Sequence, residues 1–184
     1  MVIYYLRRQL RFRNVAVDLV CEILRNNTPT NWTDPFFRIS VHARQGNFTN
    51  KEQIVFGMTT ADYLNALRHL FAKQTSGSNI QVGITSDNVT WTRNVLRGVV
   101  NESIQLLYSV NHNVDFDLAL PSFCDAVITS TGTFGWWGAW LIDKQTIYFE
   151  GYPRPRSEFG SWLTPGDYTL VVNHLQSTIM YHHV

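Results

Sequence analysis

The segment 130-STGTFGWWGAWL-141 combines three glycines with three tryptophans, and it directly follows the apolar run 125-DAVIT-129. An apolar strand that leads through a glycine-rich turn into a helix leaves backbone N–H groups and the positive end of the helix dipole pointing outward. Such a helix start is suited to a phosphate group. The competing interpretation is a tight turn with aromatic core packing, and we expect the three tryptophans to pack rather than to stack on a sugar.

Short apolar runs alternate with amphipathic segments from residue 36 onward. The pattern predicts strands at residues 36–42, 79–85, 104–108, 126–129 and 146–149, and helices at residues 60–73, after residue 88, at residues 117–124 and over the Gly/Trp segment. Pro121 fits its helix only if that helix starts late or is distorted. Residues 151–167 hold three prolines and are predicted to be surface loop. Strands that alternate with helices indicate an α/β fold, a Rossmann-like parallel sheet flanked by helices.

Composition limits the classes of partner. The chain has 184 residues, enough for one good core, and a formal net charge of +1. This balance predicts no nucleic-acid or membrane-surface partner. We interpret the one local excess of charge, at Arg7, Arg8, Arg11 and Arg13, as the solvated face of a helix. No apolar run reaches the length of a bilayer span. We therefore expect a soluble chain, with any membrane anchor absent from it.

Sequons and cysteines bear on the compartment. Five Asn-x-Ser/Thr sequons begin at Asn26, Asn31, Asn47, Asn88 and Asn101. This density favours the lumen of the secretory pathway, and chance in a chain rich in Asn and Thr is the alternative. Two cysteines allow at most one disulfide, so they leave the redox compartment undecided.

The carboxyl ends of the predicted strands carry the polar residues of most interest. In open α/β sheets ligands bind outside these ends, which brings together the loops at residues 42–48, 86–88, 115–118 and 131–134. The loops supply an arginine, a histidine, three aspartates and the glycine-rich helix start, a set suited to a diphosphate with a sugar or base.

Each of these residues also has a plainer interpretation. Arg44 is the strongest candidate for binding an anion, and its alternative is a salt bridge to Asp87. His42 is either a ligand contact or a structural histidine at a strand end. Ser86 and Asp87 either line a pocket or only cap the following helix, for which Asp87 or Asn88 is a natural N-cap.

Four blocks of sequence, at residues 42–48, 85–87, 117–124 and 130–141, resemble the alpha-1,2-fucosyltransferase family, which uses GDP-fucose. Their order and spacing match over roughly residues 36–165. The last block is the most specific. The first departs from the family pattern His-x-Arg-Arg-Gly-Asp-Tyr, because this chain has Gln45, Asn47 and Phe48 in place of Arg, Asp and Tyr.

The resemblance implies a metal-independent, inverting transferase of two facing Rossmann-like domains, a GT-B-type glycosyltransferase without a cofactor. Residues 36–184 would form the GDP-fucose-binding domain, and residues 1–35 would be a remnant of the acceptor-side region. The partners implied are GDP-fucose and a galactose-terminated glycan, joined in an alpha-1,2 linkage. The implied location is the luminal side of the Golgi membrane.

The resemblance also implies roles for single residues. Arg44 would be catalytic, because it would pair with the diphosphate and stabilise the negative charge that builds on the departing GDP. Asp117 would accept hydrogen bonds from the guanine edge, and no general base is assigned. The other predicted contacts to GDP-fucose are a helix start at Gly132, Thr133 and Phe134, a pocket wall of Ser86 and Asp87, and His42 beside a phosphate or the fucose ring.

Two alternatives stay open. Asp115-Phe116-Asp117 is an Asp-x-Asp triplet, which in another class of glycosyltransferase holds a divalent metal against the diphosphate. The other alternative is a non-catalytic or degenerate donor-binding fragment. Gln45 removes one positive charge, Asn47 begins a sequon inside the site, and residues 1–35 can supply neither an acceptor domain nor an anchor.

Overall fold

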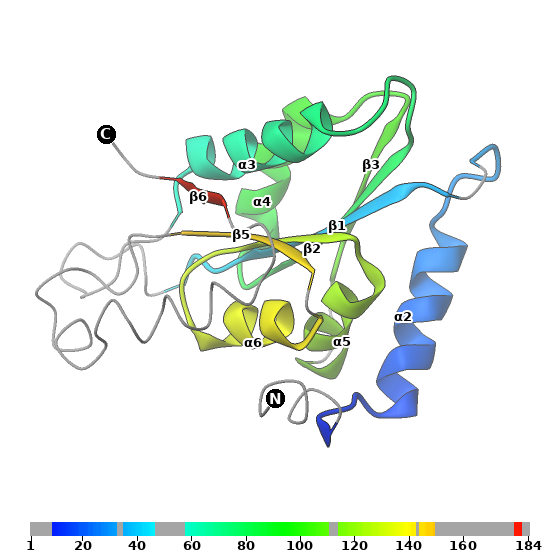
Figure 1. Cartoon of the computed structure of the whole chain (residues 1–184), viewed down its shortest axis with the longest axis vertical. Coiled ribbons are helices and arrows are strands. Elements are labelled where there is room, and N and C mark those ends of the chain that lie inside the picture. Colours follow the sequence, from blue (N-terminus) through cyan, green and yellow to red (C-terminus); the bar gives the residue numbers. More distant parts are fainter. Residues whose placement is uncertain are drawn as a thin grey trace, which may run out of the picture.

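The computed structural model describes residues 9–32, 35–46, 58–110, 114–142, 144–149 and 179–181. Six strands form one sheet in which every neighbouring pair is parallel, in the order β3-β2-β1-β4-β5-β6 (Figure 1). The strands are β1 (Phe37–Ala43), β2 (Ile80–Ser86), β3 (Ile104–Tyr108), β4 (Ala126–Thr129), β5 (Gln145–Phe149) and β6 (Ile179–Tyr181). This order is that of a doubly wound Rossmann sheet. The predicted fold class is therefore confirmed.

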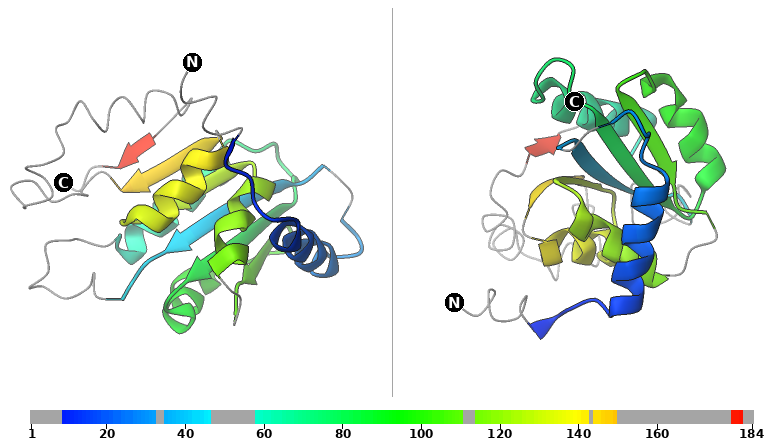
Figure 2. Two further views of the ribbon diagram at one scale, coloured as in Figure 1. Left: turned by 90° about the horizontal axis from the view of Figure 1, so that it is seen from below. Right: turned by 90° about the vertical axis from the view of Figure 1, so that its right-hand side faces the viewer.

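One face of the sheet is covered by α3 (Thr60–Ala72) and α4 (Val89–Leu96), and the other by α5 (Val114–Ala119) and α6 (Thr133–Ile142) (Figures 1 and 2). The main core lies under α3, where Ile39 and Val41 of β1 are fully buried. The start of α3 has a complete capping box, in which the Thr59 hydroxyl accepts from the Asp62 N–H and the Asp62 carboxylate accepts from the Thr59 N–H.

The helix predicted at residues 117–124 takes a different form. The α-helical turns begin at Val114 and end at Ala119, and a 3₁₀ turn, η3 (Leu120–Phe123), follows. Pro121 explains the change, since it lacks the N–H that would continue the α-helical ladder and is tolerated in the first turn of a new helix. The predicted distortion at Pro121 is confirmed, and the predicted bounds are wrong.

Helix α2 (Asn14–Asn26) was not predicted. It packs on α5 and η3 through one cluster of buried residues: Ala16, Val20, Leu24, Phe116, Ala119, Leu120 and Cys124. Arg11 and Arg13 precede this helix, so their placement on a helix face is wrong; Arg7 and Arg8 lie outside the described residues. The domain boundary between residues 35 and 36 stays a prediction.

Strand β6 was not predicted, and the expected loop at residues 151–167 lies outside the described residues. Cys21 and Cys124 are free thiols. Among the helices that the structure describes, none is long and apolar enough to cross a bilayer.

Candidate functional site

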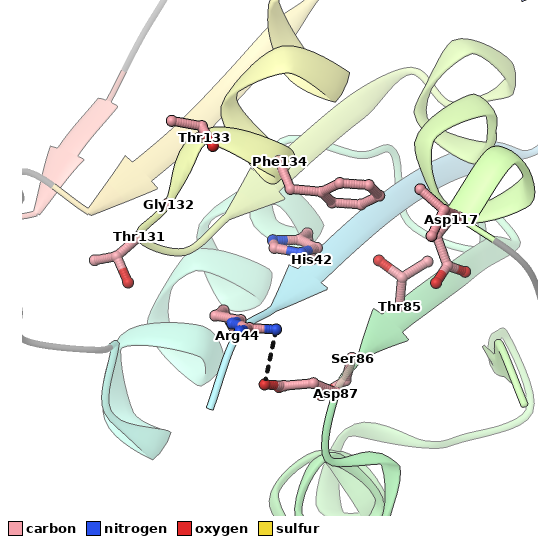
Figure 3. A pocket seen from close by; sticks show the side chains of 11 residues that line it. His42, Arg44, Thr85, Ser86, Asp87, Asp117, Thr131, Gly132, Thr133 and Phe134 are labelled. Carbon is pink, nitrogen blue, oxygen red and sulfur yellow. Dashed lines mark ion pairs between the residues drawn. The ribbon is translucent and has the colours of Figure 1, made fainter. Parts of the chain in front are cut away.

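A cavity of about 430 Å³ opens at the carboxyl ends of β1, β2 and β4 (Figure 3). The strand order reverses between β1 and β4, which is where doubly wound sheets bind their ligands. Four separate segments of the chain supply the lining: His42, Arg44, Thr85, Ser86, Asp87, Val114, Asp117, Thr131, Gly132, Thr133 and Phe134. All eight residues predicted for the site are in this lining, and their roles as ligand contacts stay predictions.

Asp87 organises the turn that follows β1. Its Oδ2 lies 3.2 Å from Nη1 of Arg44, the pair that Figure 3 marks with a dashed line. The same carboxylate accepts the N–H of Gln45 on Oδ1 and the N–H of Gly46 on Oδ2, each at 2.8 Å. The salt bridge foreseen for Arg44 is thus present. A guanidinium has five N–H donors, so this pairing is compatible with binding a phosphate as well.

Gly46 has no side chain for a geometric reason. A Cβ at this position would lie 2.6 Å from Oδ2 of Asp87. The carboxylate can therefore approach the backbone of the turn only because residue 46 is glycine. On the other side of the turn, the N–H of Arg44 donates to Oγ of Ser130 at 2.9 Å.

Ser86 and Asn88 complete the end of β2. The Ser86 hydroxyl donates to the carbonyl of Ala43 at 2.7 Å and accepts the N–H of Asn88 at 3.0 Å. Asn88 is the N-cap of α4, since its Oδ1 accepts the N–H of Trp91. Asp87 is therefore available to the turn after β1 instead of capping the helix.

His42 lines the cavity as a neutral imidazole. Burial lowers its pKa to about 4; Asp87 raises this pKa less than burial lowers it, and Arg44 lowers it further. The ring centroid lies 5.3 Å from that of Phe134. In the described part of the chain neither Nδ1 of His42 nor the buried hydroxyl of Thr131 has a hydrogen-bond partner. Buried polar atoms without partners are costly, so a ligand or water here would be stabilising.

The start of α6 comes unusually close to the sheet. Gly132, in the turn before it, has φ of +102°, a conformation that favours glycine. At Gly135 a Cβ would lie 2.1 Å from Oγ1 of Thr129 and 2.5 Å from Nδ1 of His42. Gly132 therefore allows the conformation of the turn, and Gly135 allows α6 to pack closely on the sheet. Together they bring the positive end of this ten-residue helix to the cavity.

The tryptophans of α6 pack on one another. Trp136 and Trp140 are stacked with centroids 6.1 Å apart, and Trp137 meets both edge to face. Trp140 is buried, whereas Trp137 is 43% exposed. None of the three lines the cavity.

The two carboxylates of the Asp-x-Asp triplet have different partners. Asp117 faces the cavity and accepts the Ser109 hydroxyl on Oδ1 at 2.6 Å. Asp115 is paired with Arg13, which precedes α2. Across the described ranges, no group of three or more His, Cys, Asp or Glu side chains is arranged to hold a metal ion.

Sequence reasoning assigned no role to three lining residues, although it placed Thr131 in the predicted loop at residues 131–134. Thr85 is the register partner of His42 in the pairing of β1 with β2, and it directly precedes Ser86. Val114 lies one helical turn before Asp117, so the i, i+3 spacing of a helix places both on one face. The predicted helix began at residue 117, three residues too late to include Val114.

The sequence pattern of glycosyl transferase family 11 matches residues 4–167, most of the 184-residue chain and all four segments that line the cavity. The chain belongs to glycosyl transferase family 11. The family match includes α2 as well as strands β1 to β5, so residues 4–35 belong to the matched region, and β6 lies beyond it.

Named relatives confirm the resemblance of this family 11 chain to alpha-1,2-fucosyltransferases. It is 28% identical over 131 residues to galactoside alpha-(1,2)-fucosyltransferase 2 of Rattus norvegicus, covering 70% of this chain and 36% of the relative. The enzyme of the same name from Gorilla gorilla gorilla is 30% identical over 131 residues, covering 70% and 38%. Galactoside 2-alpha-L-fucosyltransferase Sec1 of Mus musculus is 27% identical over 138 residues, covering 73% and 37%. The match thus spans little more than a third of each of these relatives.

Two solved fucosyltransferase structures share a more distant likeness. POFUT1 in complex with GDP aligns with a TM-score of 0.49 at 14% identity, covering 76% of this chain and 47% of POFUT1. NodZ alpha-1,6-fucosyltransferase, co-crystallised with GDP, aligns with a TM-score of 0.43 at 16% identity, covering 76% and 45%. The fold assignment of the family 11 chain rests on its own strand order.

Proposed function

We propose that this chain binds GDP-fucose and is the donor-binding part of a GT-B-type alpha-1,2-fucosyltransferase, which transfers L-fucose with inversion to a galactoside hydroxyl without a metal ion. Family membership and the names of the relatives support the reaction class. The observation that carries the proposal is the cavity at the β1/β4 reversal, which both Arg44 and the start of α6 line.

The diphosphate would lie between Arg44 and the turn at Gly132 and Thr133. The guanidinium supplies a fixed positive charge, and the helix start adds the positive end of its dipole. Negative charge grows on GDP as the bond to fucose breaks, and groups already in place stabilise that charge without reorganising. Arg44 is thus the proposed catalytic residue.

The guanine base would lie toward α5. Asp117 offers a carboxylate that can accept hydrogen bonds from the N–H groups of guanine, and the Ser109 hydroxyl orients this carboxylate. Val114, 66% exposed, adds an apolar surface beside it in the cavity wall. This arrangement would favour guanine over adenine, whose corresponding edge does not present the same pair of donors.

A neutral His42 limits what the site can do. With its pKa near 4 the ring carries no charge at neutral pH, so it can orient a phosphate or the fucose ring by a hydrogen bond only. Positive charge at the diphosphate then comes from Arg44 and from α6.

The partners of the aspartates favour the metal-independent reaction. A metal held by an Asp-x-Asp motif needs both carboxylates near the diphosphate, and Asp115 is engaged by Arg13 instead. Loss of GDP-fucose binding in EDTA, with recovery in Mn²⁺, would favour the metal-dependent alternative.

One observation favours a second function, a chain that binds the donor without transferring fucose. The family pattern has two arginines in its first block; here Gln45 replaces one, and Asp87 partly neutralises the other. The charge available to stabilise departing GDP is smaller as a result. We keep the domain boundary between residues 35 and 36, a galactose-terminated acceptor glycan and a luminal Golgi location as parts of the proposal.

Calorimetric titration tests the proposal directly. The purified chain is titrated with GDP and GDP-fucose in EDTA and then in Mn²⁺, beside Arg44→Ala and the matched control Arg93→Ala. Arg93 stacks on Tyr108 outside the cavity. Saturable binding in EDTA that is weakened about tenfold or more only in Arg44→Ala supports the proposal, and absence of binding in both media contradicts it. A radiolabelled fucose transfer assay to a galactoside then separates a transferase from a donor-binding chain.

A further inference from the structure

The sequon at residues 101–103 is folded into a tight turn ahead of β3. Oδ1 of Asn101 accepts the N–H of Ser103, two residues on, at 2.9 Å, which is an Asx turn. The carbonyl of Asn101 accepts the N–H of Ile104 at 3.1 Å, which closes a β-turn over the same residues. Asn101 itself is exposed.

We propose that Asn101 is an N-glycosylation site, an acceptor for an oligosaccharide from a lipid diphosphate donor in the secretory lumen. The turn holds the side-chain oxygen against the backbone, so Nδ2 projects on the opposite side of the same amide. The turn needs only four consecutive residues, so it can form in a nascent chain before the sheet does. This inference uses the luminal location of the proposed function and is independent of fucose transfer.

The other described sequons are less suited. Asn88 caps α4 with its side chain, and it adjoins Asp87, so a glycan there would lie at the cavity. Asn26 is in the last turn of α2, and the hydroxyl of its sequon partner Thr28 donates to the carbonyl of Leu24. Parts of the sequons that begin at Asn31 and Asn47 lie outside the described residues.

The surroundings of Asn101 leave room for a glycan. Asn101 is one of the residues that line an open cavity of about 640 Å³, together with Trp32 and Tyr108. This turn lies at the amino end of β3, whereas the candidate site lies at the carboxyl ends of the strands. A glycan on Asn101 would therefore leave the site open.

The step itself balances without an oxidant or reductant. Nδ2 of Asn101 attacks the anomeric carbon of the first sugar, and a new C–N bond forms. The bond from that carbon to the lipid diphosphate breaks, and the electron pair leaves with the diphosphate. The amide nitrogen gives up one proton, which the departing diphosphate can accept, and the side-chain oxygen of Asn101 can still accept the Ser103 N–H.

The test is site mapping by mass spectrometry. The full chain is expressed in a eukaryotic cell behind a cleavable secretion signal, with a standard sequon in a terminal tag that reports entry into the lumen. Peptides are released and treated with peptide N-glycosidase in heavy-oxygen water, which marks every formerly glycosylated asparagine as labelled aspartate. We expect Asn101 to be labelled in the majority of chains whose tag sequon is labelled. Labelling of Asn101 in a minority of those chains overturns the proposal.

Three variants separate the modification from the fold. Asn101→Asp keeps an oxygen for the Ser103 N–H but has no amide nitrogen, and Ser103→Ala keeps the backbone turn but destroys the sequon. Each should lose the mass of one glycan from the intact protein. Ser103→Thr should retain it. An intact mass of Asn101→Asp that still includes every glycan of the parent chain would contradict the proposal, and the mapping of the parent chain needs none of these variants to fold.

Discussion

The Asp87 carboxylate lies 3.2 Å from the Arg44 guanidinium and also accepts the N–H groups of the two residues that follow Arg44. One acidic side chain at the end of β2 therefore holds the backbone of the turn after β1 in place and also offsets part of the positive charge of Arg44. Asp87 acts in this site as a positioning residue, and Arg44 is the residue placed to meet a ligand.

Replacing Arg44 by alanine should weaken GDP binding by about 10- to 100-fold, because a charge-assisted hydrogen bond to phosphate contributes about 1.5–3 kcal/mol. Calorimetry measures the affinity. Arg93 is exposed like Arg44, but it lines the cavity beside Asn101 and not the candidate site. The affinity of Arg93→Ala for GDP should therefore match that of the parent chain. Equal losses in the two variants would mean that general charge, not the site, attracts GDP.

Asp87→Ala should lower both stability and affinity. Two backbone N–H groups lose their acceptor and Arg44 loses its ion pair, so we expect the free energy of unfolding to fall by about 1–3 kcal/mol. Loss of the fixed turn should weaken GDP binding by more than the removal of one negative charge strengthens it. Asp125→Ala is the matched control, since Asp125 also accepts a backbone N–H, that of Arg38, but does so at the amino ends of the strands. Urea titration and calorimetry on both variants should show a stability loss in each and an affinity loss in Asp87→Ala alone.

Gly135→Ala should destabilise the fold by about 1–3 kcal/mol, the usual cost of overpacking. The added methyl group would overlap Oγ1 of Thr129 and Nδ1 of His42, so α6 must move away from the sheet. Gly98→Ala is the control, because a Cβ there has no neighbour within 4 Å. Thermal unfolding of both variants measures the difference, and an unchanged melting temperature in Gly135→Ala would refute the close approach.

His42 should make stability depend on pH. Its pKa in the folded protein is about 4, below the ordinary 6.5, so the unfolded chain binds the proton more readily. The free energy of unfolding is therefore unaffected by this group above pH 6.5 and decreases as the pH falls toward 4, by at most about 3.4 kcal/mol at 1.36 kcal/mol per pH unit. Urea unfolding of the parent chain and His42→Gln from pH 7.5 to pH 4.5 should show a steeper fall for the parent; parallel curves would disprove it.

How far the sequence predicted the molecule depended on local signals. The alternation of apolar residues in β1 and β2, and the apolar run of β4, are local signals, and strands β1 to β5 were placed within about a residue of where they lie. Helix α2 was missed because no capping side chain marks its start: its N-cap is Arg13, which makes no side-chain capping bond. Strand β6 has three residues, too few for a period to be read.

The sequence predicted which residues line the site, but not which hydrogen bonds each of them makes. The rule that ligands bind at the carboxyl ends of parallel strands brought His42, Arg44 and Asp117 to one cavity. It could not show that Asp87 turns toward Gln45 and Gly46 while Asn88 caps α4. That choice depends on the register of β1 against β2, and on a glycine at residue 46 that admits the carboxylate.

The reversal of strand order has a consequence for the time course of folding. Strand β1 must pair with β4, and the contact between Arg38 and Asp125 at the start of that pairing joins residues 87 positions apart. Contacts between distant segments slow folding, because the loop must close before they form. The β1-β2-β3 half can assemble first on the ribosome, but Arg44 meets Ser130 and the start of α6 only after β4 has been made. A ligand bound at the candidate site thus cannot guide early folding, and should stabilise only chains whose sheet has already been extended through β4.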